Sequence, residues 1–337
     1  MVHLPLVNNV KIPEHTMTVL GFLIEIAQFD VVGNDLVFGE AVAFPADQEE
    51  LLRRPFVETG YESNYAFVNM GTNVIIIAVL LVFKVILLLF VPCRKQNNCV
   101  GRSHRKCSKV IFWNFWLRLV IQSCLEITIA ACIYLIDREK YVEALSEEYS
   151  TFILFNDILS FSLLLILAVA PFWIIIFYCC RFKKFADKDF VSTYGSTISG
   201  LRTDRRSVIF QPVYFLLRRY AFFYIAIRWA DNSSGQIHFL IMSNMIAALY
   251  ILSFRPFNAR LLHNLEVFNE VTSLILLYVT IGFLHKVYVD DDEQSHWYML
   301  EDTARREGLG WGFMGIMGVN VGVHLFFLIR STCLDCQ

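Results

Sequence analysis

The sequence is poor in charged residues. They make up 18% of the 337 residues, whereas soluble domains carry about 25%. The formal net charge is only −2, so no surplus of basic side chains marks a nucleic-acid-binding face. Hydrophobic residues make up 56%, with 30 phenylalanines among them, and the mean hydropathy is +0.51. Composition therefore predicts an integral membrane protein whose first partner is the lipid bilayer.

Catalytic and metal-binding patterns are also missing from the sequence. His238, His263 and His324 lie on different segments, and no nucleophile or acid pair accompanies any of them. The cysteines and the histidine between positions 93 and 107 follow no compact zinc-site spacing. We therefore expect a protein that is not an enzyme and that holds neither a metal nor a cofactor.

A signal peptide is missing as well. Met1 is not followed by a basic region and a short apolar core. An exposed amino end would then need another explanation: either the first apolar stretch acts as a reverse anchor, or the chain is the membrane part of a longer protein. We expect the second.

Seven apolar stretches are long enough to cross a hydrocarbon core of about 30 Å. They cover 74–91, 111–136, 152–180, 213–229, 237–254, 265–284 and 309–329. The sequence therefore predicts an all-α, polytopic helix bundle. An extracellular or interfacial segment over 1–72 would precede a seven-helix transmembrane domain over 73–330, and a short cytoplasmic tail over 331–337 would follow.

Basic residues are concentrated in alternate loops. Most follow the first and third apolar stretches, at 94–109 and 181–206, and others follow the fifth and seventh. The positive-inside rule places these loops in the cytoplasm, the amino end outside and the carboxyl end inside. No cysteine falls in a segment predicted to lie outside, so we expect no disulfide framework.

Polar side chains recur every four residues in the second apolar stretch, at Asn114, Arg118, Gln122 and Glu126. This spacing keeps them on one face of a helix. A charge near the bilayer centre costs at least about 2.5–3.5 kcal/mol, so that face has to look into a helix bundle or a wet cavity. The stripe favours a transporter, channel or receptor over a simple anchor.

Further polar side chains fall inside the apolar stretches. They could form a structural network or line an ion pathway, and we expect Arg118 or Lys84 to pair with Glu126 or Glu270. The candidate residues are Lys84, Arg118, Gln122, Glu126, Asp157, Arg218, Arg219, Asn269, Glu270 and Asn320.

Acidic residues cluster between the last two apolar stretches, at Asp290, Asp291, Asp292 and Glu293. The predicted topology makes this an outer loop, which is either simply solvated or raises the local concentration of cations. The segment is too polar for a convincing pore helix.

The last apolar stretch is rich in glycine. Gly318 and Gly322 form a small-xxx-small pair that permits close helix packing. The alternative is a flexible, gate-lining helix on which Asn320 and His324 share one face.

Short strings of residues carry a resemblance to known membrane proteins. Before and within the first four stretches these are Pro5-Leu6, Phe29-Asp30, Gly60-Tyr61-Glu62-Ser63-Asn64, Asn69-Met70-Gly71, Arg118 with Leu125-Glu126, and Leu217-Arg218-Arg219. Before and at the start of the sixth they are Arg255-Pro256-Phe257, Asn264-x-Glu266 and Asn269-Glu270. The chain resembles the TRP-like membrane region of large protist surface proteins of the ciliate type, and is distantly similar to the fungal TRP-like flavin-carrier group.

The resemblance implies a cysteine-rich ectodomain upstream and a six-helix channel unit in the last six stretches. We therefore expect a plasma-membrane TRP-like cation channel or a channel-derived membrane domain, with cations and further copies of the chain or a larger membrane assembly as partners. A non-conducting anchor or scaffold for an ectodomain is the alternative. A seven-helix receptor would fit the topology, but receptors usually carry an outer disulfide, and no cysteine of this chain is predicted to lie outside.

Overall fold

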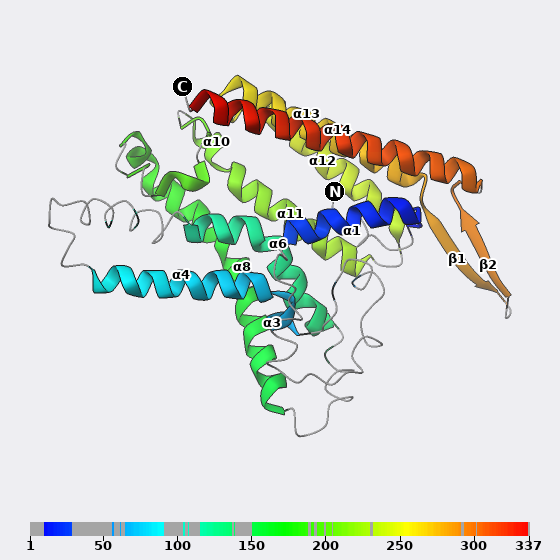
Figure 1. Cartoon of the computed structure of the whole chain (residues 1–337), viewed down its shortest axis with the longest axis horizontal. Helices are drawn as coiled ribbons and strands as arrows, with labels where there is room; N and C mark the ends of the chain where they lie inside the picture. Colours follow the sequence, from blue (N-terminus) through cyan, green and yellow to red (C-terminus); the bar gives the residue numbers. More distant parts are fainter. Residues whose placement is uncertain are drawn as a thin grey trace. The chain divides into compact units, whose positions relative to one another are not determined.

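The computed structural model of the chain describes residues 10–28, 56, 61, 65–90, 104, 107, 115–136, 138, 150–187, 190–191, 194–198, 200–203, 205–229, 232–290, 293–300 and 302–335. The regular elements among these residues are helices and one hairpin (Figure 1). The helices are α1 (Glu14–Gln28), α3 (Ala66–Asn69), α4 (Gly71–Leu89), α6 (Phe115–Ile136), α8 (Ser150–Arg181), α10 (Arg206–Ile209), α11 (Gln211–Arg228), α12 (Ser233–Phe254), α13 (Arg260–Ile281) and α14 (Thr303–Asp335). The 3₁₀ turns η7 (Phe182–Ala186) and η8 (Gly195–Ile198) and the strands β1 (His285–Asp290) and β2 (Glu293–Tyr298) complete the set.

Within the described residues, four helical segments are long and apolar enough to cross a membrane. They are Ile153–Phe185, Ser233–Phe254, Arg260–Ile281 and Thr303–Arg330. These segments contain or overlap the third, fifth, sixth and seventh predicted stretches. The prediction of a helical, multi-span membrane protein is confirmed to that extent.

The other three predicted stretches are also helical, in α4, α6 and α11, but they are not among the four segments found long and apolar enough to span within the described residues. The described apolar runs in α4 and α6, Ile75–Leu89 and Ser123–Ile136, are shorter. In α11 the residues Arg218, Arg219 and Arg228 interrupt the apolar sequence. The seven-span arrangement and the orientation of the two ends therefore stay predictions.

The chain divides into two compact units, and the predicted division at residues 72 and 330 into pre-membrane segment, transmembrane domain and tail stays a prediction. The C-terminal unit comprises Met1–Ile26, Glu58–Gly60 and Tyr224–Gln337, and the middle unit comprises Ala27–Val57 and Tyr61–Phe223. The division falls inside α11 and splits the predicted pre-membrane segment 1–72 between the units. Most of helix α1 thus falls in the same unit as the last three helices.

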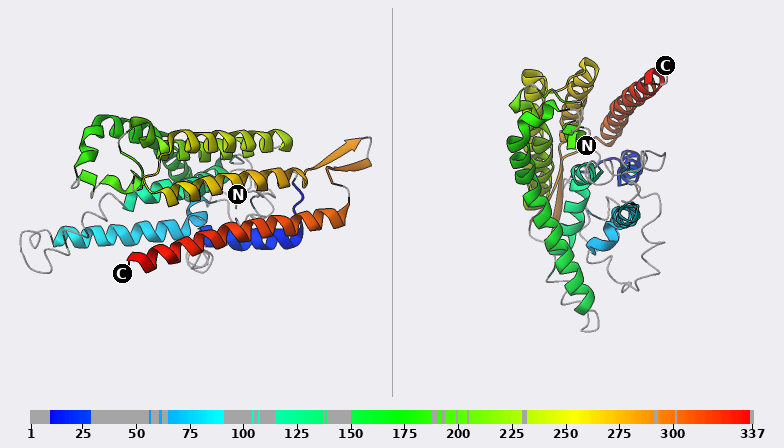
Figure 2. Two further views of the ribbon diagram at one scale, coloured as in Figure 1. Left: turned by 90° about the horizontal axis from the view of Figure 1, so that it is seen from above. Right: turned by 90° about the vertical axis from the view of Figure 1, so that its left-hand side faces the viewer.

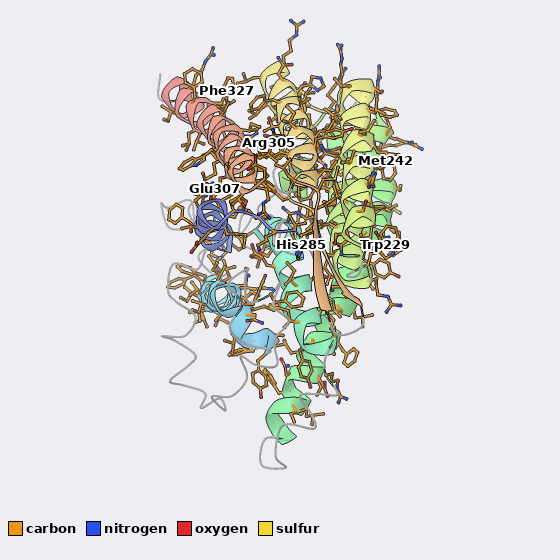
Figure 3. All side chains as sticks on the ribbon, turned by 90° about the vertical axis from the view of Figure 1, so that its right-hand side faces the viewer. Trp229, Met242, His285, Arg305, Glu307 and Phe327 are labelled. Atoms are coloured by element: carbon orange, nitrogen blue, oxygen red, sulfur yellow. The ribbon has the colours of Figure 1, made fainter. Side chains whose placement is uncertain are left out.

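In the C-terminal unit, α12 packs along α13, and α13 packs against α14 (Figures 1 and 2). Ile237 of α12 and Leu276 of α13 are buried, and the rings of Phe283 and Phe313 meet edge to face at 6.3 Å. The outer surfaces are apolar: Figure 3 shows Met242 on α12, which is 56% exposed, amid the side chains of these helices. Such exposure fits helices surrounded by lipid.

Helix α1 is held against the C-terminal helices at its start. The backbone N–H of Lys11 donates to the carbonyl oxygen of Phe283 at 2.9 Å. His15 stacks on Trp311 of α14, with ring centroids 4.8 Å apart, and Leu20 is fully buried. The start of α1 is therefore packed on the C-terminal helices.

The segment between α13 and α14 forms a two-stranded hairpin rather than the expected loop. Strands β1 and β2 are antiparallel, with pairs running from His285–Tyr298 to Asp290–Glu293. The run Val287-Tyr288-Val289 has high strand propensity, which outweighs the acidic character of the segment. Asp290 and Glu293 form the last described pair, and Asp291 and Asp292 lie outside the described residues.

In the middle unit, α6 packs against α8, and the short helix α3 contacts both. Ile129, Ala131 and Tyr134 of α6 are buried in this contact region. The opposite side of α8 is apolar and more than half exposed, at Leu154, Ile158, Phe161, Leu165 and Phe172. Helix α8 therefore packs against the rest of the middle unit with one face and presents an exposed apolar face, suited to lipid, on the other side.

Candidate functional site

The closest polar contact between α13 and α14 joins Asn269, Asn320 and His324, here called the Asn–His cluster. Asn320 Nδ2 donates to Asn269 Oδ1 at 3.1 Å, and His324 Nε2 lies 2.6 Å from the same oxygen. An amide oxygen can only accept, so His324 carries a proton on Nε2. One oxygen thus holds two side chains that are one turn apart on α14.

Polar groups of α13 next to the cluster extend it towards α12. Glu266 and Glu270 are half-buried, one turn apart, and interact electrostatically. The amide of Asn244, buried on α12, donates to the backbone oxygen of Glu270 at 2.6 Å. The turn 266–270 therefore links three helices through polar contacts inside otherwise apolar segments.

A second polar group lies in the middle unit around Glu126 of α6. Ser123 Oγ donates to Asn73 Oδ1 at 3.1 Å, and Asn73 also hydrogen-bonds to Glu126. The charged neighbour of Glu126 is Arg219 of α11. The expected partner was Arg118 or Lys84; the side chain of Arg118 lies outside the described residues, so that pairing stays a prediction.

Arg219 makes several contacts with α6 and its own helix. Its Nη1 donates to the backbone oxygen of Ile121 at 3.2 Å and lies 3.6 Å from the sulfur of Cys124. Its guanidinium carbon sits 4.1 Å from the centre of the Phe215 ring, a cation–π geometry. These contacts and the nearby Glu126 explain how an arginine is accommodated in this unit.

Asp157, predicted as a pathway residue, is engaged in a bidentate ion pair. Arg138 donates from Nε to Oδ1 at 2.8 Å and from Nη2 to Oδ2 at 2.7 Å. These hydrogen bonds and the charge of Asp157 raise the pKa of the Arg138 guanidinium above its ordinary value. The adjacent Asn156 caps α3, because its Oδ1 accepts the N–H of Ala66 at 2.9 Å.

The structure thus sorts the predicted site residues into separate groups. Asn269, Glu270 and Asn320 lie together in the C-terminal unit, while Arg219 lies within electrostatic range of Glu126 in the middle unit. Lys84 and Arg218 are half-buried in the middle unit, and the side chains of Arg118 and Gln122 lie outside the described residues.

We call the Asn–His cluster together with Glu266, Glu270 and Asn244 the α13 group. Its members His324, Asn244 and Glu266 were not among the candidate site residues predicted from the sequence. The four-residue spacing between Asn320 and His324 was a usable signal for His324, because it places both side chains on one helix face. Asn244 stands alone in an apolar run, so its partner could not be read from spacing.

The chemistry available at the α13 group is that of amide oxygens, two carboxylates and one imidazole. Among the residues that the structure describes, no three His, Cys, Asp or Glu side chains are grouped to hold a metal ion. Comparisons of the chain with protein-family models, with curated proteins and with solved structures find no match.

Proposed function

We propose that the chain is a multi-pass plasma-membrane protein that conducts cations, as a TRP-like channel or a channel-derived membrane domain. The observation that carries the proposal is the Asn–His cluster with Glu266 and Glu270 beside it. Amide oxygens and carboxylates are the groups that replace the hydration shell of a cation. In this proposal α13 and α14 line the pathway as the last two helices of a six-helix unit.

Several copies of the chain would surround such a pathway. On α14, a Cβ added at Gly312, Gly315, Gly318 or Gly322 would meet nothing within 4 Å. Close packing of Gly318 and Gly322 therefore does not occur within the described part of the chain, and that face has room for a helix of a second copy. A symmetric ring with seven crossings per chain, amino end outside, completes the proposal.

Cation flux into liposomes that contain the purified chain tests this proposal. We expect flux in the wild type and a loss of at least severalfold in Glu270→Gln and in Asn269→Val, which remove a charge and the shared oxygen. Val271→Ala is the matched control, since Val271 is on the same helix and exposed. Flux no greater than in empty liposomes, from correctly folded protein, would refute conduction.

A non-conducting anchor or scaffold is the second candidate, and one observation favours it. The polar side chains that could line a pathway also bind one another: Asn269 with Asn320 and His324, and Asp157 with Arg138. In a scaffold these contacts would serve only to hold helices together. Asn269→Val would then lower the melting temperature in a protein that passes no ions.

A further inference from the structure

The segment that follows α8 is folded into an ordered platform rather than extending from the helix end. Residue 182 begins the 3₁₀ turn η7 directly after Arg181, and η8 packs against α6. Backbone hydrogen bonds from Asp187 to Lys184 and from Val191 to Asp187 close the intervening chain. We call the described residues of this segment, 181–187, 190–191, 194–198, 200–203 and 205–206, the α8 platform.

Aromatic side chains hold this platform against the end of α8. Phe185 packs edge to face on Tyr178 of α8 at 5.6 Å and on Phe190 at 5.4 Å. Phe177 of α8 contacts Phe190 at 6.2 Å and Tyr194 at 5.6 Å. Tyr178 and Phe185 are each 4% exposed, so the rings form a small core that fixes the loop beside the helix.

The basic side chains of the platform face outwards from this aromatic core. Arg181, Lys183, Lys184, Arg205 and Arg206 are all exposed. The guanidinium carbon of Arg206 lies 5.4 Å from the centre of the Phe182 ring, which brings the far end of the platform back to the helix end. Asp187 is the exposed acid among the described platform residues, so positive charge dominates.

We propose that the α8 platform binds the headgroups of anionic phospholipids such as phosphatidylserine. The apolar segment Ile153–Phe185 contains Lys183 and Lys184 in its last turn, so these charges lie where a spanning helix leaves the hydrocarbon core. Aromatic rings and basic residues at that level are the usual neighbours of headgroups. Each basic residue near an anionic leaflet adds favourable electrostatic free energy.

The number and spacing of the exposed basic residues favour a membrane surface over a free anion as the ligand. They lie near both ends of the platform sequence, at Arg181, Lys183, Lys184, Arg205 and Arg206. Several separate charges suit several headgroups in one leaflet, whereas a soluble phosphate needs donors that point at one spot. The inference does not depend on ion conduction.

The experiment measures which lipids surround the full chain in bilayers of phosphatidylcholine that contain a minor fraction of phosphatidylserine, which makes the surface anionic. Spin-labelled phosphatidylserine and phosphatidylcholine report the selectivity. We expect the wild type to prefer phosphatidylserine, and Lys183→Gln with Lys184→Gln to reduce that preference about fivefold per charge at low salt. Arg305→Gln is the control, because Arg305 is exposed but paired with Asp302.

A second variant separates a fixed platform from mere net charge. Phe185→Ala removes the central ring and keeps every basic residue, so it should also weaken the preference while α8 remains inserted. Three results would overturn the proposal: equal preference in the double lysine variant and the wild type, an equal loss in Arg305→Gln, or displacement of the lipid by millimolar inorganic phosphate.

Discussion

At the scale of single residues, Asp157 and Arg138 form the best-defined ion pair of the middle unit. Asp157 is 14% exposed and accepts two short hydrogen bonds from Arg138, which is 42% exposed. Two-point guanidinium–carboxylate contacts are among the stronger protein hydrogen bonds. The pair therefore ties α8 to the chain that follows α6.

Replacing Asp157 by Asn should lower the free energy of unfolding by about 1–2 kcal/mol. We expect a value near the lower end of this range, because Arg138 is partly exposed and solvent screens its charge. Thermal unfolding in micelles measures the effect, and a double-mutant cycle with Arg138→Gln isolates the pair. The comparison pair is Asp302 and Arg305, three residues apart and much more exposed. Asp302→Asn should cost less than about 0.5 kcal/mol; equal losses for the two pairs would contradict this account.

Arg219 illustrates why an arginine and a lysine differ at such a position. Its planar group contacts the Ile121 oxygen, the Cys124 sulfur and the Phe215 ring at once. A lysine keeps the charge but cannot reproduce the fork or the stacking.

We therefore expect Arg219→Lys to lower the melting temperature, by the loss of about 1 kcal/mol or more. Arg228→Lys, at the exposed end of the same helix, should leave it unchanged. Similar melting temperatures for both variants would show that the contacts of Arg219 contribute little.

At the scale of elements, Gly310 allows α1 to approach α14. A Cβ at this position would lie 2.7 Å from Thr16 Oγ1, 2.9 Å from His15 Nε2 and 2.9 Å from Pro13 Cγ. These atoms belong to the first turn of α1 and the residue before it. An alanine here would force these side chains, or the start of α1, to shift.

Gly310→Ala should therefore destabilise the protein by about 1–3 kcal/mol through overpacking, and should expose α1 to proteolysis. Gly312→Ala is the matched control, since its Cβ would meet open space; higher helix propensity should leave it equal or up to about 1 kcal/mol more stable. Unchanged protease resistance in Gly310→Ala would show that α1 is held elsewhere.

The elements also show where reading the sequence works and where it fails. Apolar length predicted helices at all seven stretches, because backbone polar groups in lipid have to bond within their own segment. The hairpin was missed because acidic composition was given more weight than the strand propensity of Val287–Val289. The proximity of Arg219 to Glu126 could not be read from the sequence, because four-residue spacing defines a helix face but not which helix covers it.

At the scale of the whole molecule, the distribution of basic residues predicts which segments face outside. The hairpin between α13 and α14 should be extracellular, and the turn between α12 and α13 cytoplasmic. In intact cells, a membrane-impermeant maleimide should label Ser295→Cys and leave Asn258→Cys unlabelled. The native thiols Cys179 and Cys180 are exposed in the structure but predicted to be cytoplasmic, so they serve as internal controls. The reverse labelling pattern would invert the topology.

The sequence by itself determined that this is a helical membrane protein and marked polar positions within it. It could do so because apolar length and charge placement report the cost of burying each residue in lipid, one segment at a time. Only the tertiary structure decided which polar groups meet: Asn269 with Asn320 and His324, Asp157 with Arg138, and Ser123 with Asn73. Those pairings depend on how neighbouring helices are rotated and which of them touch. The sequence pattern is compatible with many different packings, so it does not determine the pairings.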